Sequence, residues 1–206
     1  MKKSTIGIIV VAALVVVAGL VAAAFFAGRA FFKEVKPKPV TEADRKVVVT
    51  AERLHEHGGP EPNPDYEKIT VQRFFGSATI QYEYDIPAHV EADDKVYIQS
   101  SVNVTMSSAE AIQQHTLGVL TLRAGMAAVD GVQVVAAPHL LTFGDQKYSA
   151  LLKRGDDPVG NLLVVRDGRI VHMLIVSGIY FEDAKAITEL MKPPVDEARK
   201  QFSRKR

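Results

Sequence analysis

Two histidines near the start of the chain have a spacing that suits metal binding. His55-Glu56-His57 places two imidazoles two residues apart. In an extended segment both rings would lie on one face and bind Zn²⁺ or Cu²⁺ together with a third ligand. In a helix, which we expect here, they would diverge, and a structural zinc site needs four ligands in a chain that contains no Cys. His55 and His57 are therefore candidate metal ligands, but we favour a solvent-exposed helix end.

The other titratable residues form no recognisable catalytic arrangement. His172 lies in an apolar segment, where a hydrogen-bonded core residue is a simpler interpretation than a ligand or a base. Asp93-Asp94 and Asp156-Asp157 fall in expected turns, where such residues usually cap the backbone, whereas paired catalytic carboxylates face each other across a cleft. The sequence has no nucleophile elbow, zinc-protease motif, P-loop or dinucleotide-binding glycine motif. We therefore predict a non-catalytic protein without a cofactor.

An uncharged apolar run near the N-terminus predicts a membrane anchor. No charged residue lies between Lys3 and Arg29, and residues 6–28 are almost wholly apolar. A bilayer core about 30 Å thick is crossed by roughly 20 apolar residues in a helix, whereas a cleaved secretory signal has an apolar core of about 7–15. We expect residues 1–32 to form a retained transmembrane anchor that contacts the lipid bilayer through residues 6–28. A cleaved signal peptide and a buried helix of a soluble protein are the alternatives.

The charges around this run give conflicting indications of its orientation. Four basic residues follow the run by residue 38, and only Lys2 and Lys3 precede it; positive charge favours the cytoplasmic side. A Met-Lys-Lys start followed directly by an apolar run is, however, the usual beginning of an export signal. We expect a single-pass protein whose domain lies outside the cytoplasm, in the periplasm or at the cell surface. Pairs of small residues such as Ala18/Ala22 and Gly19/Ala23 would also permit self-association.

Charge is unevenly distributed along the chain. The formal net charge is +1, but residues 47–198 contain 12 Lys or Arg and 21 Asp or Glu. Residues 199–206 contain five basic residues and no acidic one. Because nucleic-acid binding requires a basic face, the acidic body argues against a nucleic-acid partner. The basic C-terminal tail could contact anionic lipid headgroups, although a solubilising role is the simpler interpretation.

The first part of the domain combines helical and extended patterns. Pro37 and Pro39 predict an extended spacer, so we assign residues 33–46 to a linker and residues 47–206 to the globular domain. Thr41 and Asp44 resemble a capping box, and the apolar spacing that follows predicts a helix ending near Gly58. The β-branched run of residues 47–50 opposes this helix.

Alternating apolar residues then predict two strands and a long helix. Residues 80–86 and 96–106 alternate apolar and polar side chains, as a strand with one buried face does, and residues 88–94 form the turn between them. Ser107 and Glu110 form a capping motif for a helix that extends to about Ala128. Its apolar positions recur at helical spacing: Ile112, Leu117, Leu120, Ala124 and Ala127.

The second half predicts a run of strands and a final helix. Residues 132–143 form a strand interrupted at Pro138, and residues 147–154 form another. Residues 161–178 are two apolar runs joined by Asp167-Gly168, a dipeptide that fits a type I′ hairpin turn. Both arms are apolar on both faces, so we expect this hairpin at the centre of the sheet, covered by helices. A helix from about residue 181 is expected to stop at Pro193-Pro194, and Val195, Ala198 and Phe202 suggest one more short turn or helix after it.

These elements predict an α+β domain, an antiparallel sheet with flanking helices, preceded by one transmembrane helix. Their order resembles the fold shared by the photosystem extrinsic protein PsbP, the Ran-binding Mog-type proteins and the bacterial DcrB family. The most similar segment is residues 144–191, a Gly-led strand, a second strand, a turn, a strand ending in apolar-Ser-Gly, and a helix opening with Phe-Glu-Asp. The resemblance spans about residues 69–191. It implies a binding or assembly role and identifies no functional residue.

The sequence thus predicts a membrane-anchored protein with an extracytoplasmic, non-catalytic domain that binds an unidentified protein partner or supports an assembly. Two alternatives remain open. One is an envelope hydrolase whose His and acidic residues are brought together only by the fold. The other is a metal carrier that uses His55 and His57.

Overall fold

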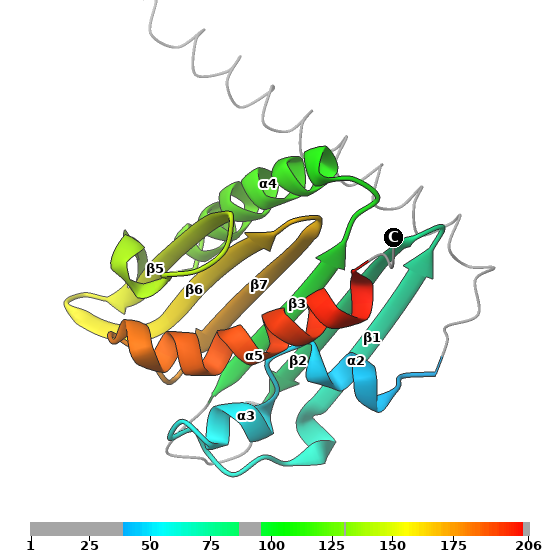
Figure 1. Cartoon of the computed structure of the whole chain (residues 1–206). Coiled ribbons are helices and arrows are strands. Elements are labelled where there is room, and N and C mark those ends of the chain that lie inside the picture. Colours follow the sequence, from blue (N-terminus) through cyan, green and yellow to red (C-terminus); the bar gives the residue numbers. More distant parts are fainter. Residues whose placement is uncertain (1–38, 87–95, 130, 204–206) are drawn as a thin grey trace, which may run out of the picture. The chain divides into compact units, whose positions relative to one another are not determined.

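The computed structural model describes residues 39–86, 96–129 and 131–203 (Figure 1). The expected anchor, residues 1–32, and the expected turn, residues 88–94, lie outside these ranges. Among the helices that are described, none is both long and apolar enough to cross a bilayer. The elements are α2 (Glu42–Lys46), α3 (Ala51–His55), η2 (Pro64–Tyr66), β1 (Glu67–Phe74), β2 (Ser77–Asp85), β3 (Tyr97–Val104), α4 (Ser108–Ala127), β4 (Val132–Ala136), η3 (Pro138–Leu140), β5 (Gln146–Arg154), β6 (Asp157–Asp167), β7 (Ile170–Ser177) and α5 (Ala184–Phe202).

The described strands form one seven-stranded sheet, in the order β1-β2-β3-β7-β6-β5-β4. Every neighbouring pair is antiparallel. The α+β class and the antiparallel sheet with flanking helices are therefore confirmed. The hairpin β6–β7 lies at the centre, as its two-sided apolar pattern predicted, and β3 pairs with β7 to join the two halves of the sheet.

Strand β1 was not predicted from the sequence. Val71 is its only buried residue, and the remaining side chains of Glu67–Phe74 are exposed or half-buried. The strand lies at the edge of the sheet and pairs only with β2. An edge strand that buries so little apolar surface lacks the alternation on which sequence-based recognition depends.

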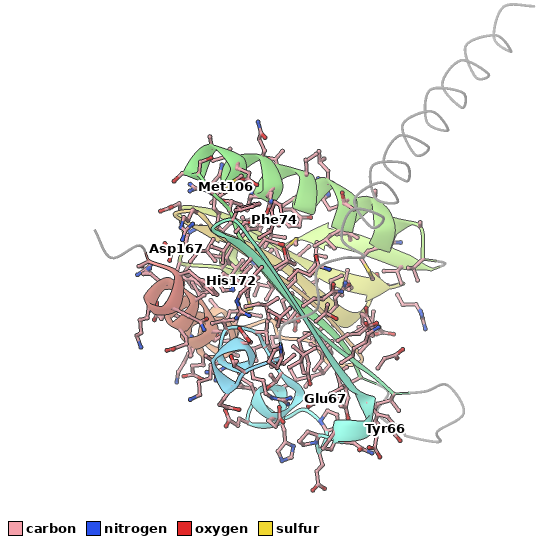
Figure 2. All side chains as sticks on the ribbon, turned by 90° about the vertical axis from the view of Figure 1, so that its right-hand side faces the viewer. Tyr66, Glu67, Phe74, Met106, Asp167 and His172 are labelled. Atoms are coloured by element: carbon pink, nitrogen blue, oxygen red, sulfur yellow. The ribbon has the colours of Figure 1, made fainter. Side chains whose placement is uncertain are left out.

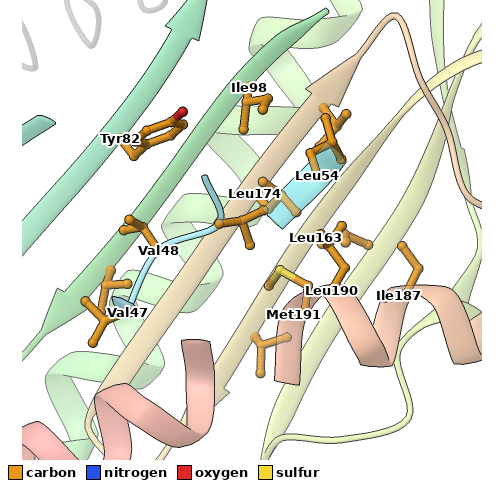
Figure 3. Close-up of a cluster of buried hydrophobic side chains, with 14 of the residues drawn as sticks. Val47, Val48, Leu54, Tyr82, Ile98, Leu163, Leu174, Ile187, Leu190 and Met191 are labelled. Carbon is orange, nitrogen blue, oxygen red and sulfur yellow. The ribbon is translucent and has the colours of Figure 1, made fainter. Parts of the chain in front are cut away.

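Helices cover both faces of the sheet (Figure 1). The larger core lies on the face covered by α5 and by residues 47–54, where Leu54, Leu163, Leu174, Ile187 and Leu190 pack together (Figure 3). On the other face α4 packs against two smaller groups of apolar residues. β6 and β7 supply side chains to both sides, which explains why their sequences are apolar throughout.

The helix expected over about residues 42–58 is broken into two short helices. The capping box of Thr41 and Asp44 is present at the start of α2, but the β-branched residues 47–50 separate α2 from α3. Backbone amides in and after this segment form hydrogen bonds with side chains of the sheet. The Val49 amide donates to Ser100 Oγ at 2.9 Å, and the amide of Ala51, the first residue of α3, donates to the Tyr82 hydroxyl at 2.8 Å. Side-chain acceptors on the sheet thus replace a helical turn.

The range assigned to a linker, residues 33–46, includes α2 in its described part. Asp44 of this helix is fully buried and forms an ion pair with Arg73 of β1. The described residues from Pro39 to Ser203 belong to one compact unit. The folded unit therefore begins earlier than Val47, because a buried charge in α2 requires its partner on the sheet.

The last helix does not stop at Pro193-Pro194, as the sequence predicted, but continues to Phe202. Proline lacks the amide that would bond the carbonyl four residues earlier, so Pro194 leaves the Leu190 carbonyl without its helical donor. Arg53 Nε donates to this carbonyl at 3.0 Å. Pro194, Val195 and Ala198 are buried, and their packing favours continuation of the helix across the prolines.

The central hairpin turn differs in type from the prediction. Asp167 pairs with Ile170, so the two loop residues are Gly168 and Arg169 rather than Asp167 and Gly168. Gly168 has a φ of +60°, and it is the only one of the two with a positive φ. This pattern is that of a type II′ turn, with glycine at its first central position.

We predict that Gly168→Val destabilises the domain by about 1–3 kcal/mol, because a β-branched residue is strained at positive φ. No atom lies within 4 Å of a Cβ built at this position, so the loss would come from the backbone and not from a clash. Gly168→Asn is the matched control and should lose less, since Asn tolerates this conformation better. Equal melting temperatures for the wild type and the Val variant would contradict the turn assignment.

Candidate binding surface

The outward face of α4 carries large apolar side chains. Ile112, Leu117 and Leu120 have exposed fractions of 43%, 62% and 57%. These are the positions whose spacing predicted the helix, and such a pattern normally marks the buried face. Here it marks the surface, so we call Ile112, Leu117, Leu120 and the exposed Ala109, Ala124 and Ala127 between them the α4 outer face.

The inner face of α4 combines small, polar and apolar residues: Ala111 and His115 are buried, and Val119, Leu122 and Met126 pack against apolar residues of the sheet. Ala111 is fully buried against Val164 and Val171. A Cβ added to Gly118 would lie 2.9 Å from Met173 Sδ, which is closer than packed atoms approach. Helix α4 therefore carries apolar residues on both sides, and the periodicity of Ile112, Leu117 and Leu120 did not indicate which side is buried.

The two helices that cover the sheet differ in their outward surfaces. The outward side of α5 carries charged residues in ion pairs along the helix, among them Lys192–Asp196 at 2.5 Å and Lys200–Glu197 at 3.6 Å. Within α4, all of which is described, the only charged residues are Glu110 and Arg123. Glu110 accepts a hydrogen bond from the Met106 amide, and Arg123 stacks over the Tyr148 ring. The residues of the α4 outer face thus carry no charge, although the exposed Gln113 and Thr116 lie between Ile112 and Leu117 and the exposed Arg123 follows Leu120.

A second surface lies where three turns meet at one end of the sheet. Arg169 donates to the carbonyls of Gly76 at 3.1 Å, Thr105 at 2.8 Å and Phe202 at 2.7 Å. One guanidinium therefore fixes the β1–β2 turn, the start of α4 and the end of α5 relative to the β6–β7 turn. We call this surface, made of residues 74–76, 105–106, 168–169 and 202–203, the turn end.

The turn end exposes an aromatic and a methionine side chain. Phe75 is 84% exposed and Met106 is 58% exposed. Phe75 has a φ of +39°, the only positive value among the described residues other than glycine. Beside it lies a hollow of about 480 Å³ whose lining includes Arg73, Val104 and Phe202. Figure 2 shows Phe74 and Met106 at this end and Tyr66 and Glu67 at the opposite one.

The candidate metal ligands lie in separate environments. His55 is the last residue of α3, and its Nδ1 lies 3.0 Å from the Gly59 carbonyl oxygen. His57 follows in the turn after the helix. Among the residues that the structure describes, no group of three or more His, Cys, Asp or Glu is placed to hold a metal ion. The metal-carrier hypothesis stays a prediction from the sequence.

His172 is a buried core residue, as expected, but one of its two ring nitrogens lacks the expected hydrogen bond. It lies on β7 with 3% of its surface exposed, and its Nε2 has no hydrogen-bond partner among the described residues. Burial lowers the pKa of His172 to about 4, although the charge of Asp167 acts in the opposite direction. Burial also lowers the pKa of His115, which lies on the inner side of α4. Both imidazoles are therefore neutral in the folded domain near pH 7.

The two acidic pairs show no catalytic arrangement in the described part of the chain. Asp156 lies in the turn between β5 and β6, and Asp157 is the first residue of β6. Asp93 and Asp94 fall outside the described ranges.

Comparison with known proteins found no matching family model, no similar curated protein and no similar solved structure. The resemblance to the PsbP, Mog-type and DcrB fold family therefore stays a prediction from the order of the elements.

We predict that acid destabilises this domain partly through His172. The unfolded chain takes up a proton as the pH falls below 6.5, whereas the folded domain does so only near pH 4. The stability that is present above pH 6.5 should therefore be lost as the pH falls toward 4. The loss attributable to this residue at pH 4.5 is about 2–3 kcal/mol.

Urea unfolding of the wild type and the His172→Leu variant at pH 7 and pH 4.5 measures the loss of unfolding free energy that is due to His172. The variant should keep its stability at pH 7 and lose less than the wild type at pH 4.5. His139→Leu removes an exposed histidine and serves as the control. The assignment fails if His172→Leu and the wild type lose the same amount.

Proposed function

We propose that this chain is a single-pass membrane-anchored protein whose domain lies outside the cytoplasm and acts as a non-catalytic assembly module. The anchor is supported by the length of the uncharged run, residues 6–28. The assembly role is supported by one observation above all. Two helices cover the same sheet, and while α5 presents paired charges to solvent, α4 presents Ile112, Leu117 and Leu120.

An apolar helix face of this kind is typical of an interaction surface. Isolated apolar residues on a protein surface need no explanation, but a contiguous uncharged group usually marks a binding site. The face follows a helix of 20 residues, about 30 Å long. Three large residues, Ile112, Leu117 and Leu120, occupy its middle, with Ala109 on one side and Ala124 and Ala127 on the other, and small residues allow a second helix to approach closely.

We assign a second copy of this chain as the occupant of the α4 outer face. A two-fold interface brings the same patch of both copies together, so a patch with a net charge would repel itself. The α4 outer face carries no charge and meets this requirement. Anchoring in one membrane would also raise the local concentration of the copies.

Cysteine cross-linking tests this assignment, because the chain contains no Cys and an introduced thiol is unique. Leu117 lies at the middle of α4, so a two-fold axis crossing the helix there brings Leu117 of both copies together. We predict that Leu117→Cys, in the full-length protein in membranes, forms a disulfide-linked dimer under mild oxidation. Glu189→Cys on the outward side of α5 is the control and should remain monomeric.

Adding Leu120→Lys to the Leu117→Cys variant should abolish the cross-link, since two lysines would be buried against each other. Cross-linking of both single-Cys variants to the same extent would indicate random collision. A dimer seen by sedimentation of the wild type, without a cross-link at position 117, would place the interface elsewhere and contradict the assignment.

The anchor has its own test. We predict that the mature protein keeps residues 1–32 and stays in the membrane pellet after alkaline extraction, because the uncharged run exceeds the core of an ordinary secretory signal. N-terminal sequencing of the purified protein checks retention. Recovery in the soluble fraction with a sequence beginning near Phe25 or Phe31 would show that the segment is cleaved.

A further inference from the structure

We propose that the part of the sheet left uncovered beside α4 binds a neutral polysaccharide through hydroxyl and carboxamide side chains. The surface comprises six residues of β1, β2 and β3, which we call the polar sheet face: Thr70, Gln72, Thr79, Gln81, Ser101 and Asn103. This inference goes beyond the proposed function and depends on neither the anchor nor the dimer.

Helix α4 covers only part of its face of the sheet. It packs against β4, β5, β6 and β7, and the described part of the chain places no helix over the same face of β1 and β2 (Figure 1). Ser101 belongs to this face because it pairs with Met173, which lies against α4 at Gly118. Along β2 and β3, buried residues alternate with half-buried or exposed ones, and the buried ones pack under α5 and residues 47–54. The half-buried residues therefore lie on the uncovered face.

The six side chains form two rows across three strands. The first row is Thr70, Gln81 and Ser101, and the second is Gln72, Thr79 and Asn103. Residues directly opposite each other in antiparallel strands share a face, and neighbouring strands lie about 4.8 Å apart. The polar sheet face is thus a regular array of hydrogen-bonding groups.

Every residue of this array carries a hydroxyl or a carboxamide, and none carries a charge, although Asp, Glu, Lys and Arg make up 24% of the chain. Each such group both donates and accepts hydrogen bonds. A charged partner would meet no opposite charge within the array, and an apolar partner would leave polar groups without hydrogen bonds. The hydroxyls of a neutral polysaccharide donate and accept in the same way, so this class of partner matches the polar sheet face.

Contacts within the array leave donors available to a ligand. Thr79 Oγ1 donates to Asn103 Oδ1 at 3.0 Å, which leaves Asn103 Nδ2 to donate outward. Within the described ranges, the side chains of the other four residues form no hydrogen bond to the protein. Asn is disfavoured in strands, so strand propensity does not explain the position of Asn103 in β3. Ile80 and Val102, on the opposite side of the same strands, are fully buried, and a rigid backbone lowers the entropy cost of binding.

The surface continues along β3 to an aromatic ring. Gln99 lies two residues before Ser101, and the hydroxyl of the half-buried Tyr97 donates to Gln99 Oε1 at 3.4 Å. The C–H groups of a sugar ring pack favourably on an aromatic face, whose π-system is negative. From Tyr97 to Asn103 the strand extends about 20 Å. The site therefore accommodates several sugar units and should favour longer oligosaccharides.

Calorimetric titration of the full-length protein tests this inference. The protein is held in a zwitterionic detergent, because glycoside detergents would compete for the polar sheet face. The probes are neutral hexasaccharides of α-linked glucose, β-linked glucose and β-linked N-acetylglucosamine, the corresponding disaccharides, and polygalacturonate as a charged polymer. The test variant combines Gln72→Val with Gln81→Val, since Val suits strands. The matched control is Gln133→Val, which removes an exposed glutamine from β4.

We expect at least one hexasaccharide to bind, its disaccharide to bind more weakly, and polygalacturonate not to bind. The double variant should bind that hexasaccharide more weakly by about tenfold or more, because two hydrogen-bonding side chains are lost. The Gln133→Val variant should bind as the wild type does. If the melting temperature shows that the double variant is unfolded, Gln72→Val alone, at the exposed edge of the sheet, decides by the same criterion.

Any of three results would overturn the inference. The first is that none of the three hexasaccharides binds. The second is equal binding by the double variant and the wild type, which would place the sugar site elsewhere. The third is tighter binding of polygalacturonate than of every neutral hexasaccharide, which would assign recognition to charge. Cross-linking through Leu117→Cys is a separate measurement, so failure of the proposed dimer leaves this inference intact.

Discussion

Two-sided burial of the central hairpin is the constraint on which the rest of this domain depends. Leu162, Leu163, Val164 and Val165 of β6 are all fully buried, although successive side chains point to opposite faces of the sheet. Each face must therefore be covered by another layer. Helix α4 provides one cover, and α5 with residues 47–54 provides the other. Helix α4 lies close to β7 at Gly118, where an added Cβ would be 2.9 Å from Met173 Sδ.

The layer formed by α5 and residues 47–54 consists of segments whose unpaired backbone groups form hydrogen bonds with side chains of neighbouring segments. The extended segment between α2 and α3 bonds to Ser100 and Tyr82 of the sheet, and Tyr82 in turn donates to Glu67 at 3.0 Å. Arg53 of α3 bonds the Leu190 carbonyl that Pro194 leaves without a donor. Backbone hydrogen bonds are lost where the N-terminal helix is broken and where the last helix contains proline. Side chains from neighbouring elements replace them.

These constraints leave two surfaces with no evident role in the stability of the domain. The α4 outer face exposes Ile112, Leu117 and Leu120, and the turn end exposes Phe75 at a positive φ. In our proposal the first surface joins two copies.

The sequence alone determined the elements whose patterns depend on local chemistry. Alternation located β2 and β3, the capping serine located the start of α4, and the two apolar runs around Gly168 located the central hairpin. Strand β1 was missed because Val71 is its only buried residue. The turn at Gly168 was predicted as type I′ instead of type II′, because its two loop residues are set by the pairing of β6 with β7 and not by the local sequence.

Only the tertiary structure decided which side of each helix is buried. Periodicity specifies that Ile112, Leu117 and Leu120 share a face, but the direction of that face depends on how closely the helix must approach the sheet. In the same way, the prolines of α5 were expected to end the helix, and a donor from Arg53, 137 residues away in the chain, allows it to continue. The candidate metal ligands His55 and His57 were inferred from their local spacing in the sequence. The unpartnered Nε2 of His172 and the hydrogen bonds from Arg169 depend instead on contacts between distant segments. Such contacts arise from packing, and no single stretch of sequence encodes them.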